Sequence, residues 1–111
     1  MDLNFSFKKN KNRTMKRPPQ IPLNQFQLAI LLNDDEKQFY NAVLAENVFC
    51  RSCAGSVAKG VTVTEIHLTD LNDLLVRGNC KVCKGLVART FEFGDKKAFY
   101  DRAMKFRKDI S

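Results

Sequence analysis

The stretches "CRSCAG" at residues 50–55 and "CKVCKG" at residues 80–85 decide the fold, because together they contain every cysteine of the chain. Each has two cysteines separated by two residues, and each has a glycine two positions after the second cysteine. Two short loops of this kind can place four thiolates at about 2.3 Å from one tetrahedral metal ion. The sequence therefore predicts a four-cysteine metal site formed by Cys50, Cys53, Cys80 and Cys83.

Two other chemistries use paired cysteines. A redox dithiol normally precedes a helix in a βαβ unit, and neither pair here does so. A disulfide framework needs an oxidising compartment, and the N-terminus lacks the apolar segment of a secretory signal, so we expect a cytoplasmic protein. The 26 residues between the two pairs leave room for two strands and a turn. Zn²⁺ is favoured over iron as the usual structural ion of an all-thiolate site.

The metal is expected to be structural, because four protein thiolates leave no coordination position open for substrate. His67 is the only histidine, and it lies in a strand pattern that predicts a packed or surface side chain. The chain has no glycine-rich phosphate loop and no Ser/His/Asp set. We therefore expect no enzymatic activity.

Two amphipathic helices are predicted on either side of the cysteine motifs. The first spans residues 34–46, since Asn33 is a good N-cap and Glu36 completes a capping box. Its apolar face is predicted to contain Phe39, Ala42 and Val43. The second spans residues 95–109, with Asp95 as its cap. Its apolar stripe is predicted to contain Phe99, Ala103, Phe106 and Ile110.

Three strands are predicted between these helices. Residues 61–68, "VTVTEIHL", are rich in β-branched side chains, and their imperfect alternation predicts a bulge near Thr64 and Glu65. Residues 74–77 and 86–93 are predicted as the other two strands.

Residues 24–32 fit two interpretations. Asn24 and Gln27 have the spacing of a capping box for a short helix, whereas apolar side chains alternate along the segment as in a strand. The sequence leaves the conformation of residues 21–33 open.

Residues 49–94 resemble a zinc ribbon, in which a cysteine loop, two strands, a second cysteine loop and a third strand follow one another. Many zinc ribbons have glycine directly after the second cysteine; here Gly55 and Gly85 come one residue later, where we expect them to permit a positive φ. The resemblance implies a small α+β fold, with a three-stranded antiparallel sheet packed by the two helices. It also implies a binding module for nucleic acid or protein. The domain is predicted to span residues 21–111.

Basic residues concentrate at the ends of the chain, whose formal net charge is +7. Residues 1–20 are polar, end in Pro18-Pro19 and are predicted to form a disordered basic tail. Such a tail suits nucleic acid, DNA or RNA, although a purely solubilising tail is the alternative. The predicted nucleic-acid contacts are Lys8, Lys9, Lys11, Arg13, Lys16, Arg17 and Arg89. We add Lys97, Lys105 and Lys108 of the second helix as further candidates.

Arg89, Phe91 and Phe93 share one face of the last predicted strand, as in a stacking platform for bases. The favoured interpretation is that both phenylalanines form the core beneath the helices, because a small domain has few large apolar groups to spare.

These observations predict a structural zinc-binding module associated with nucleic acid. The alternative is a protein–protein adaptor that binds an acidic partner, and a third possibility is a rubredoxin-like iron electron carrier. No apolar run approaches the roughly 20 residues that cross a bilayer, so no membrane association is expected. The sequence leaves the oligomeric state open.

Overall fold

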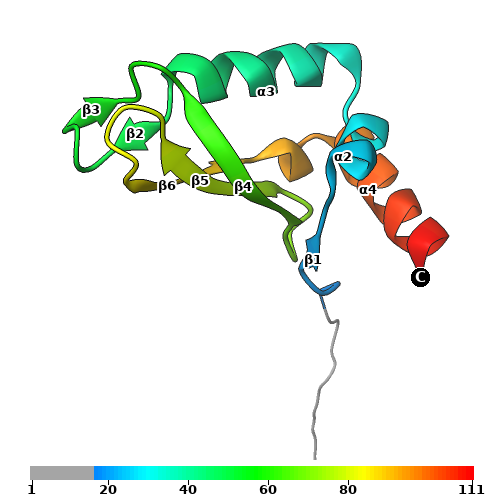
Figure 1. Cartoon of the computed structure of the whole chain (residues 1–111). Coiled ribbons are helices and arrows are strands. Elements are labelled where there is room, and N and C mark those ends of the chain that lie inside the picture. The colour runs from blue at the N-terminus through cyan, green and yellow to red at the C-terminus, as the bar shows by residue number, and fades with distance from the viewer. Residues whose placement is uncertain (1–16) are drawn as a thin grey trace, which may run out of the picture.

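The computed structural model describes residues 17–111, and Figure 1 shows the arrangement of their helices and strands. In chain order the elements are β1 (Ile21–Pro22), α2 (Gln25–Leu31), α3 (Asp34–Glu46), β2 (Phe49–Cys50), β3 (Gly55–Ser56), β4 (Val61–Leu68), β5 (Leu74–Cys80), β6 (Leu86–Phe91), the 3₁₀ turn η1 (Phe93–Asp95) and α4 (Lys97–Ile110). The fold is a small α+β structure. Most of the predicted tail, residues 1–16, lies outside the described residues.

Reciprocal capping boxes start both α2 and α3. In α2 the Asn24 side chain accepts from the Gln27 amide at 2.8 Å, and the Gln27 side chain accepts from the Asn24 amide at 2.9 Å. Asn33 and Glu36 make the same pair of bonds at the start of α3. Residues 24–32 are therefore mainly helical, because local capping satisfies the first free amides of the helix.

The buried face of α3 differs from the predicted one. Glu36, Tyr40, Val43 and Leu44 are the buried residues of this helix. Phe39 is 52% exposed, and Ala42 is exposed as well. The prediction was wrong for Ala42, and Phe39 lies at the edge of the packed face, where it still contacts Phe91 and Phe93. The packed face is rotated towards Tyr40, whose ring lies 5.2 Å from that of Phe91.

The main sheet has four antiparallel strands in the order β1-β4-β5-β6, rather than the predicted three. The short strand β1 provides the fourth by pairing with the end of β4. The predicted bulge in β4 is present as a register shift between Val63 and Glu65. Beside it, a Cβ on Gly78 would lie 2.1 Å from the Thr62 carbonyl oxygen, so only glycine permits this close approach of the two strands.

The strand ends also differ from prediction. β5 continues to Cys80, and β6 stops at Phe91, after which the chain turns through η1. β2 and β3 form a separate two-stranded hairpin. In Figure 1 this hairpin lies at one end of the main sheet, α2 and α4 lie towards the other end, and α3 runs along the sheet.

Aromatic side chains fill the core between the sheet and the helices. Phe91 and Phe93 stack with their ring centroids 5.6 Å apart, and they are only 2% and 5% exposed. Phe39 meets both rings edge-on, and Phe99 of α4 lies 5.2 Å from Phe93. The two phenylalanines therefore belong to the core, and the stacking-platform alternative is wrong for them.

Helix α4 begins at Lys97, two residues later than predicted, and Lys96 replaces Asp95 at the cap position without a side-chain capping bond. Its buried residues are Phe99, Ala103 and Phe106, as predicted, but Ile110 is exposed. No helix among residues 17–111 is long and apolar enough to cross a membrane.

Two arginines fasten α4 to the rest of the fold. Arg102 donates to the Leu31 carbonyl oxygen at 3.1 Å and to the buried Glu36 carboxylate, so it links α4 to the junction of α2 and α3. Arg107 donates to the Asn72 side chain at 2.8 Å and to the carbonyl oxygen of Thr69. Burial lowers the pKa of Arg107. The Arg107 bonds hold α4 against the β4–β5 turn. The cysteines lie at the opposite end of the sheet.

Candidate metal centre

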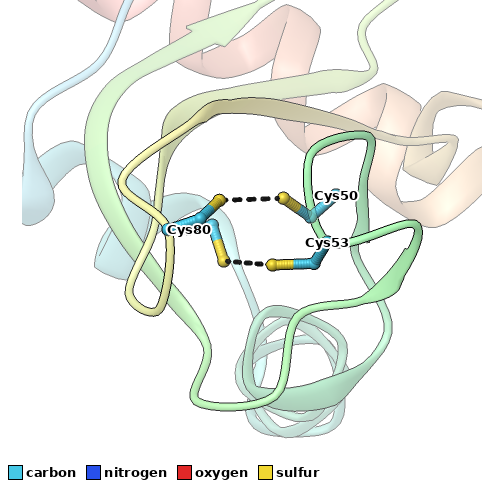
Figure 2. A group of neighbouring side chains, drawn as sticks. Cys50, Cys53 and Cys80 are labelled. Carbon is cyan, nitrogen blue, oxygen red and sulfur yellow. Dashed lines mark hydrogen bonds between the residues drawn. The ribbon is translucent and has the colours of Figure 1, made fainter.

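The four cysteines meet at the end of the sheet that carries the β2–β3 hairpin. Cys50 ends β2 and Cys80 ends β5, while Cys53 and Cys83 lie in the turns that follow. Figure 2 shows the side chains of Cys50, Cys53 and Cys80 directed into one shared space between the two turns. Strand pairing thus positions Cys50 and Cys80, and the turn after each strand directs Cys53 or Cys83 towards the same space.

The sulfur positions suit a tetrahedral ion. All four Sγ atoms lie within 4.8 Å of one another. The Sγ atoms of Cys50 and Cys83 are 3.4 Å apart, and those of Cys53 and Cys80 are 3.9 Å apart. A tetrahedron with metal–sulfur bonds of about 2.3 Å has sulfur–sulfur edges of about 3.8 Å. The cluster could therefore hold one metal ion, with each turn contributing two ligands.

The backbone of the turns corrects one prediction about glycine. The positive φ angles fall at Ala54 (57°) and Lys84 (66°), directly after the second cysteine of each pair. They do not fall at Gly55 or Gly85. A Cβ on Gly85 would lie 3.2 Å from the Cys83 sulfur, whereas nothing lies within 4 Å of one on Gly55. Gly85 thus permits close packing beside the Cys83 sulfur. The left-handed backbone conformation is adopted by Ala54 and Lys84 instead of by the glycines.

Backbone amides and neighbouring thiols shift the pKa values of two cysteines in opposite directions. The Gly85 amide donates to the Cys83 sulfur at 3.3 Å. Backbone amides of Cys83 and Val82 lower the pKa of Cys80 to about 7. Hydrogen bonds with the thiols of Cys83 and Cys50 raise the pKa of Cys53 to about 12. Crowded thiolates repel one another, so a cation must be present for all four to ionise together.

The donor set decides what such a centre can do. Cys50 and Cys80 are fully buried, and Cys53 and Cys83 are exposed, so the cluster closes the end of the sheet at its surface. Four thiolates complete a tetrahedral sphere and suit zinc or iron. Among residues 17–111, these cysteines are the one group of metal-ligating side chains that lie close enough together to share an ion. His67 lies outside it, with its Nδ1 atom 4.0 Å from the Glu65 carboxylate.

The predicted nucleic-acid residues are only partly described. Lys8, Lys9, Lys11, Arg13 and Lys16 lie outside the described residues. Arg17 forms an ion pair with Asp70 at 3.2 Å, beside the β4–β5 turn. Arg89 donates to the Asn47 carbonyl oxygen at 3.2 Å, where α3 leads into β2. The structure therefore places Arg17 and Arg89 against different connections of the fold.

The lysines of α4 are largely neutralised. Lys97 and Lys105 each form an ion pair with an aspartate four residues further along the helix, at 2.6 and 3.4 Å respectively. This pairing raises the pKa of Lys97 through its hydrogen bond with Asp101. Lys108, the third candidate on this helix, is exposed. Two of the three candidate cations of α4 thus already have acidic partners.

A second group of cations lies in the segments that carry the cysteines, and of these residues only Arg89 was among the predicted nucleic-acid contacts. Residues 47–64 and 78–91, which form the two cysteine turns and their strands, contain five basic residues and no acidic residue. The five are Arg51, Lys59, Lys81, Lys84 and Arg89. The sequence marks three of them directly, because Arg51, Lys81 and Lys84 each adjoin a cysteine.

No protein-family model, curated protein or solved structure matches this chain. The resemblance to a zinc ribbon therefore depends on the cysteine pattern alone. The fold and the site define a small α+β protein with a four-cysteine cluster that could hold a metal ion.

Proposed function

We propose that this protein is a nucleic-acid-binding module whose cysteine turns are held together by Zn²⁺, bound by Cys50, Cys53, Cys80 and Cys83. The observation that carries the metal part is the convergence of four sulfurs from two distant turns within 4.8 Å. The metal's role is structural, because the four thiolates fill its coordination sphere. We also propose that the protein has no enzymatic activity, which is the expectation from its residues.

Charge supports the nucleic-acid part of the proposal. The formal net charge is +7, and one Zn²⁺ with four thiolates carries −2, so the metal-bound chain keeps a formal charge of +5. Positive charge attracts phosphates, and the release of their counterions makes such binding weaken steeply with salt. Arg51, Lys59, Lys81 and Lys84 are part of this positive charge and form no ion pair within residues 17–111.

Elemental analysis of the purified full-length protein tests the metal. We expect one zinc per chain and a colourless sample, with zinc lost in Cys53→Ser. Ser52→Ala is the matched control, because Ser52 is exposed in the same turn and lies outside the ligand set. A coloured sample containing one iron per chain would instead support the electron-carrier alternative. A metal-free protein whose cysteine turns are folded would refute the metal site.

Fluorescence anisotropy with labelled 20-nucleotide RNA and DNA of mixed sequence tests the binding. We expect affinity for nucleic acid that falls by at least tenfold between 50 and 200 mM salt, as is typical of several phosphate contacts. Absence of binding at 50 mM salt would refute the nucleic-acid function while leaving the metal site intact.

A further inference from the structure

Four basic side chains in and beside the cysteine turns, Arg51, Lys59, Lys81 and Lys84, form no ion pair in the described part of the chain. Among residues 17–111, every ion pair involving Lys or Arg is made elsewhere, by Arg17, Arg77, Lys97, Arg102 and Lys105. The bound metal centre would carry −2, so these four positive charges exceed what the centre neutralises by two. The cysteine end of the molecule is therefore positive even with its metal bound.

Contacts between the two turns gather these cations on one surface. A Cβ on Gly85 would lie 3.1 Å from the Ser52 hydroxyl, so the turn that carries Arg51 lies against the turn that carries Lys84. The Lys84 ammonium donates to the Lys81 carbonyl oxygen at 3.2 Å. Lys81 in turn lines a shallow groove together with Lys59. The turns that carry Arg51, Lys81 and Lys84 therefore adjoin one another, and Lys59 lies in the same groove as Lys81.

Exposed apolar side chains occur within two residues of these cations in the sequence. Phe49 is 65% exposed, since β2 directs the next residue, Cys50, into the cluster and Phe49 to the other side. Leu86, at the start of β6, is 87% exposed, and β2 lies close to β6. An aromatic ring left in water next to unpaired cations is the combination that binds single strands, through base stacking and phosphate contacts.

We propose that this end of the molecule, the knuckle face formed by Phe49, Arg51, Lys81, Lys84 and Leu86, binds single-stranded nucleic acid. Arg51, Lys81 and Lys84 contact phosphates, and an unpaired base stacks on Phe49. A single strand is specified because the bases of a duplex are stacked on one another and do not offer their faces to a side chain. This inference rests on the proposed nucleic-acid function and assigns that function a surface and a ligand class.

Charge neutralisation in the full-length protein tests the surface. The triple variant R51Q/K81Q/K84Q removes three charges from the knuckle face, and the matched control K97Q/K105Q/K108Q removes three from α4. Affinity is measured for labelled dT20, rU20 and a 20-base-pair DNA duplex at several salt concentrations. We expect the knuckle variant to reduce the salt slope, d log K/d log[salt], by about 2, at about 0.7 per lost phosphate contact on single strands. The α4 control is expected to change the slope by less than half of that.

Substitution of Phe49 tests stacking separately from charge. Phe49→Tyr keeps the aromatic face and is expected to bind as wild type does. Phe49→Leu keeps an apolar side chain without the ring, and it is expected to weaken binding of dT20 and rU20 by about 5- to 150-fold. Zinc content and melting temperature of each variant establish that the fold is kept, and loss of a base contact changes neither value.

The outcomes separate this inference from the proposed function. If a full-length variant with Lys8, Lys9, Lys11, Arg13 and Lys16 replaced by glutamine loses binding while the knuckle variants keep it, the knuckle face is refuted and the nucleic-acid function stands. Equal affinity for duplex and single strand, or equal affinity of the Leu and Tyr variants, refutes the stacking assignment. Failure of the wild-type protein to bind any of the three probes refutes both.

Discussion

Removal of the metal is expected to unfold the cysteine turns and to leave the rest of the domain folded. Cys53→Ser is the sharpest perturbation, because Cys53 is an exposed ligand and its replacement disturbs little packing. The buried core is a single cluster of side chains, most of which belong to α2, α3, α4 and the middle of the sheet. Of residues 48–58, only Val48, Cys50 and Val57 are buried.

An estimate shows why this segment depends on the metal. Burial of two valines contributes about 3–6 kcal/mol. Ordering the backbone of residues 48–58 costs about 11–22 kcal/mol. The shortfall is roughly 10 kcal/mol, which is close to the ~10–16 kcal/mol that a structural zinc supplies. The segment therefore folds only with the metal bound, whereas the helices and main sheet have their own core.

Hydrogen exchange measured by mass spectrometry distinguishes the alternatives. In Cys53→Ser, or in wild type treated with a chelator, we expect amides of residues 48–58 to exchange near the rate of an unfolded chain, while α3 and α4 remain protected. Ser52→Ala serves as the control and should retain protection throughout. Unchanged protection of residues 48–58 would contradict a structural metal, and equal loss in α3 and α4 would contradict a core that is independent of it.

Three further predictions concern stability and are checked by thermal melting. Gly78→Ala should lower the free energy of unfolding by about 1–3 kcal/mol or more, because the new Cβ would lie 2.1 Å from a carbonyl oxygen of β4. Gly55→Ala is the control and should melt as wild type does, because nothing lies within 4 Å of its new Cβ. Equal melting of the two variants would contradict the close approach of the strands. Ala54→Gly and Lys84→Gly should each stabilise the protein by about 0.5–1 kcal/mol by relieving a positive φ, and a loss of stability in both would contradict the observed turns. Burial raises the pKa of Asp73 above 3.8, so its ionised form opposes folding; Asp73→Asn should stabilise the protein at pH 7, and the gain should disappear as the pH falls below 3.8. A gain that persists at pH 3 would show that this carboxylate is not its cause.

Several structural features could be read from short stretches of sequence. The capping box of Asn33 and Glu36 located the start of α3, because the bonds of a capping box join residues only three positions apart. The break in alternation along residues 61–68 located the bulge in β4, because a bulge changes which face of the sheet the following side chains point to. Local patterns were insufficient at α4, where η1 takes up Asp95 and delays the start of the helix.

The sequence by itself identified the four candidate ligands, since the two C-x-x-C spacings place four thiols in two short turns wherever those turns lie. Only the tertiary structure decided that the sulfurs meet within 4.8 Å, that β1 adds a fourth strand, and that α3 buries Tyr40 while leaving Phe39 half exposed. It also decided that the turn that carries Arg51 lies against the turn that carries Lys84. These features depend on contacts between segments far apart in the chain, and the periodicity of a short segment does not specify which distant segment will pack against it.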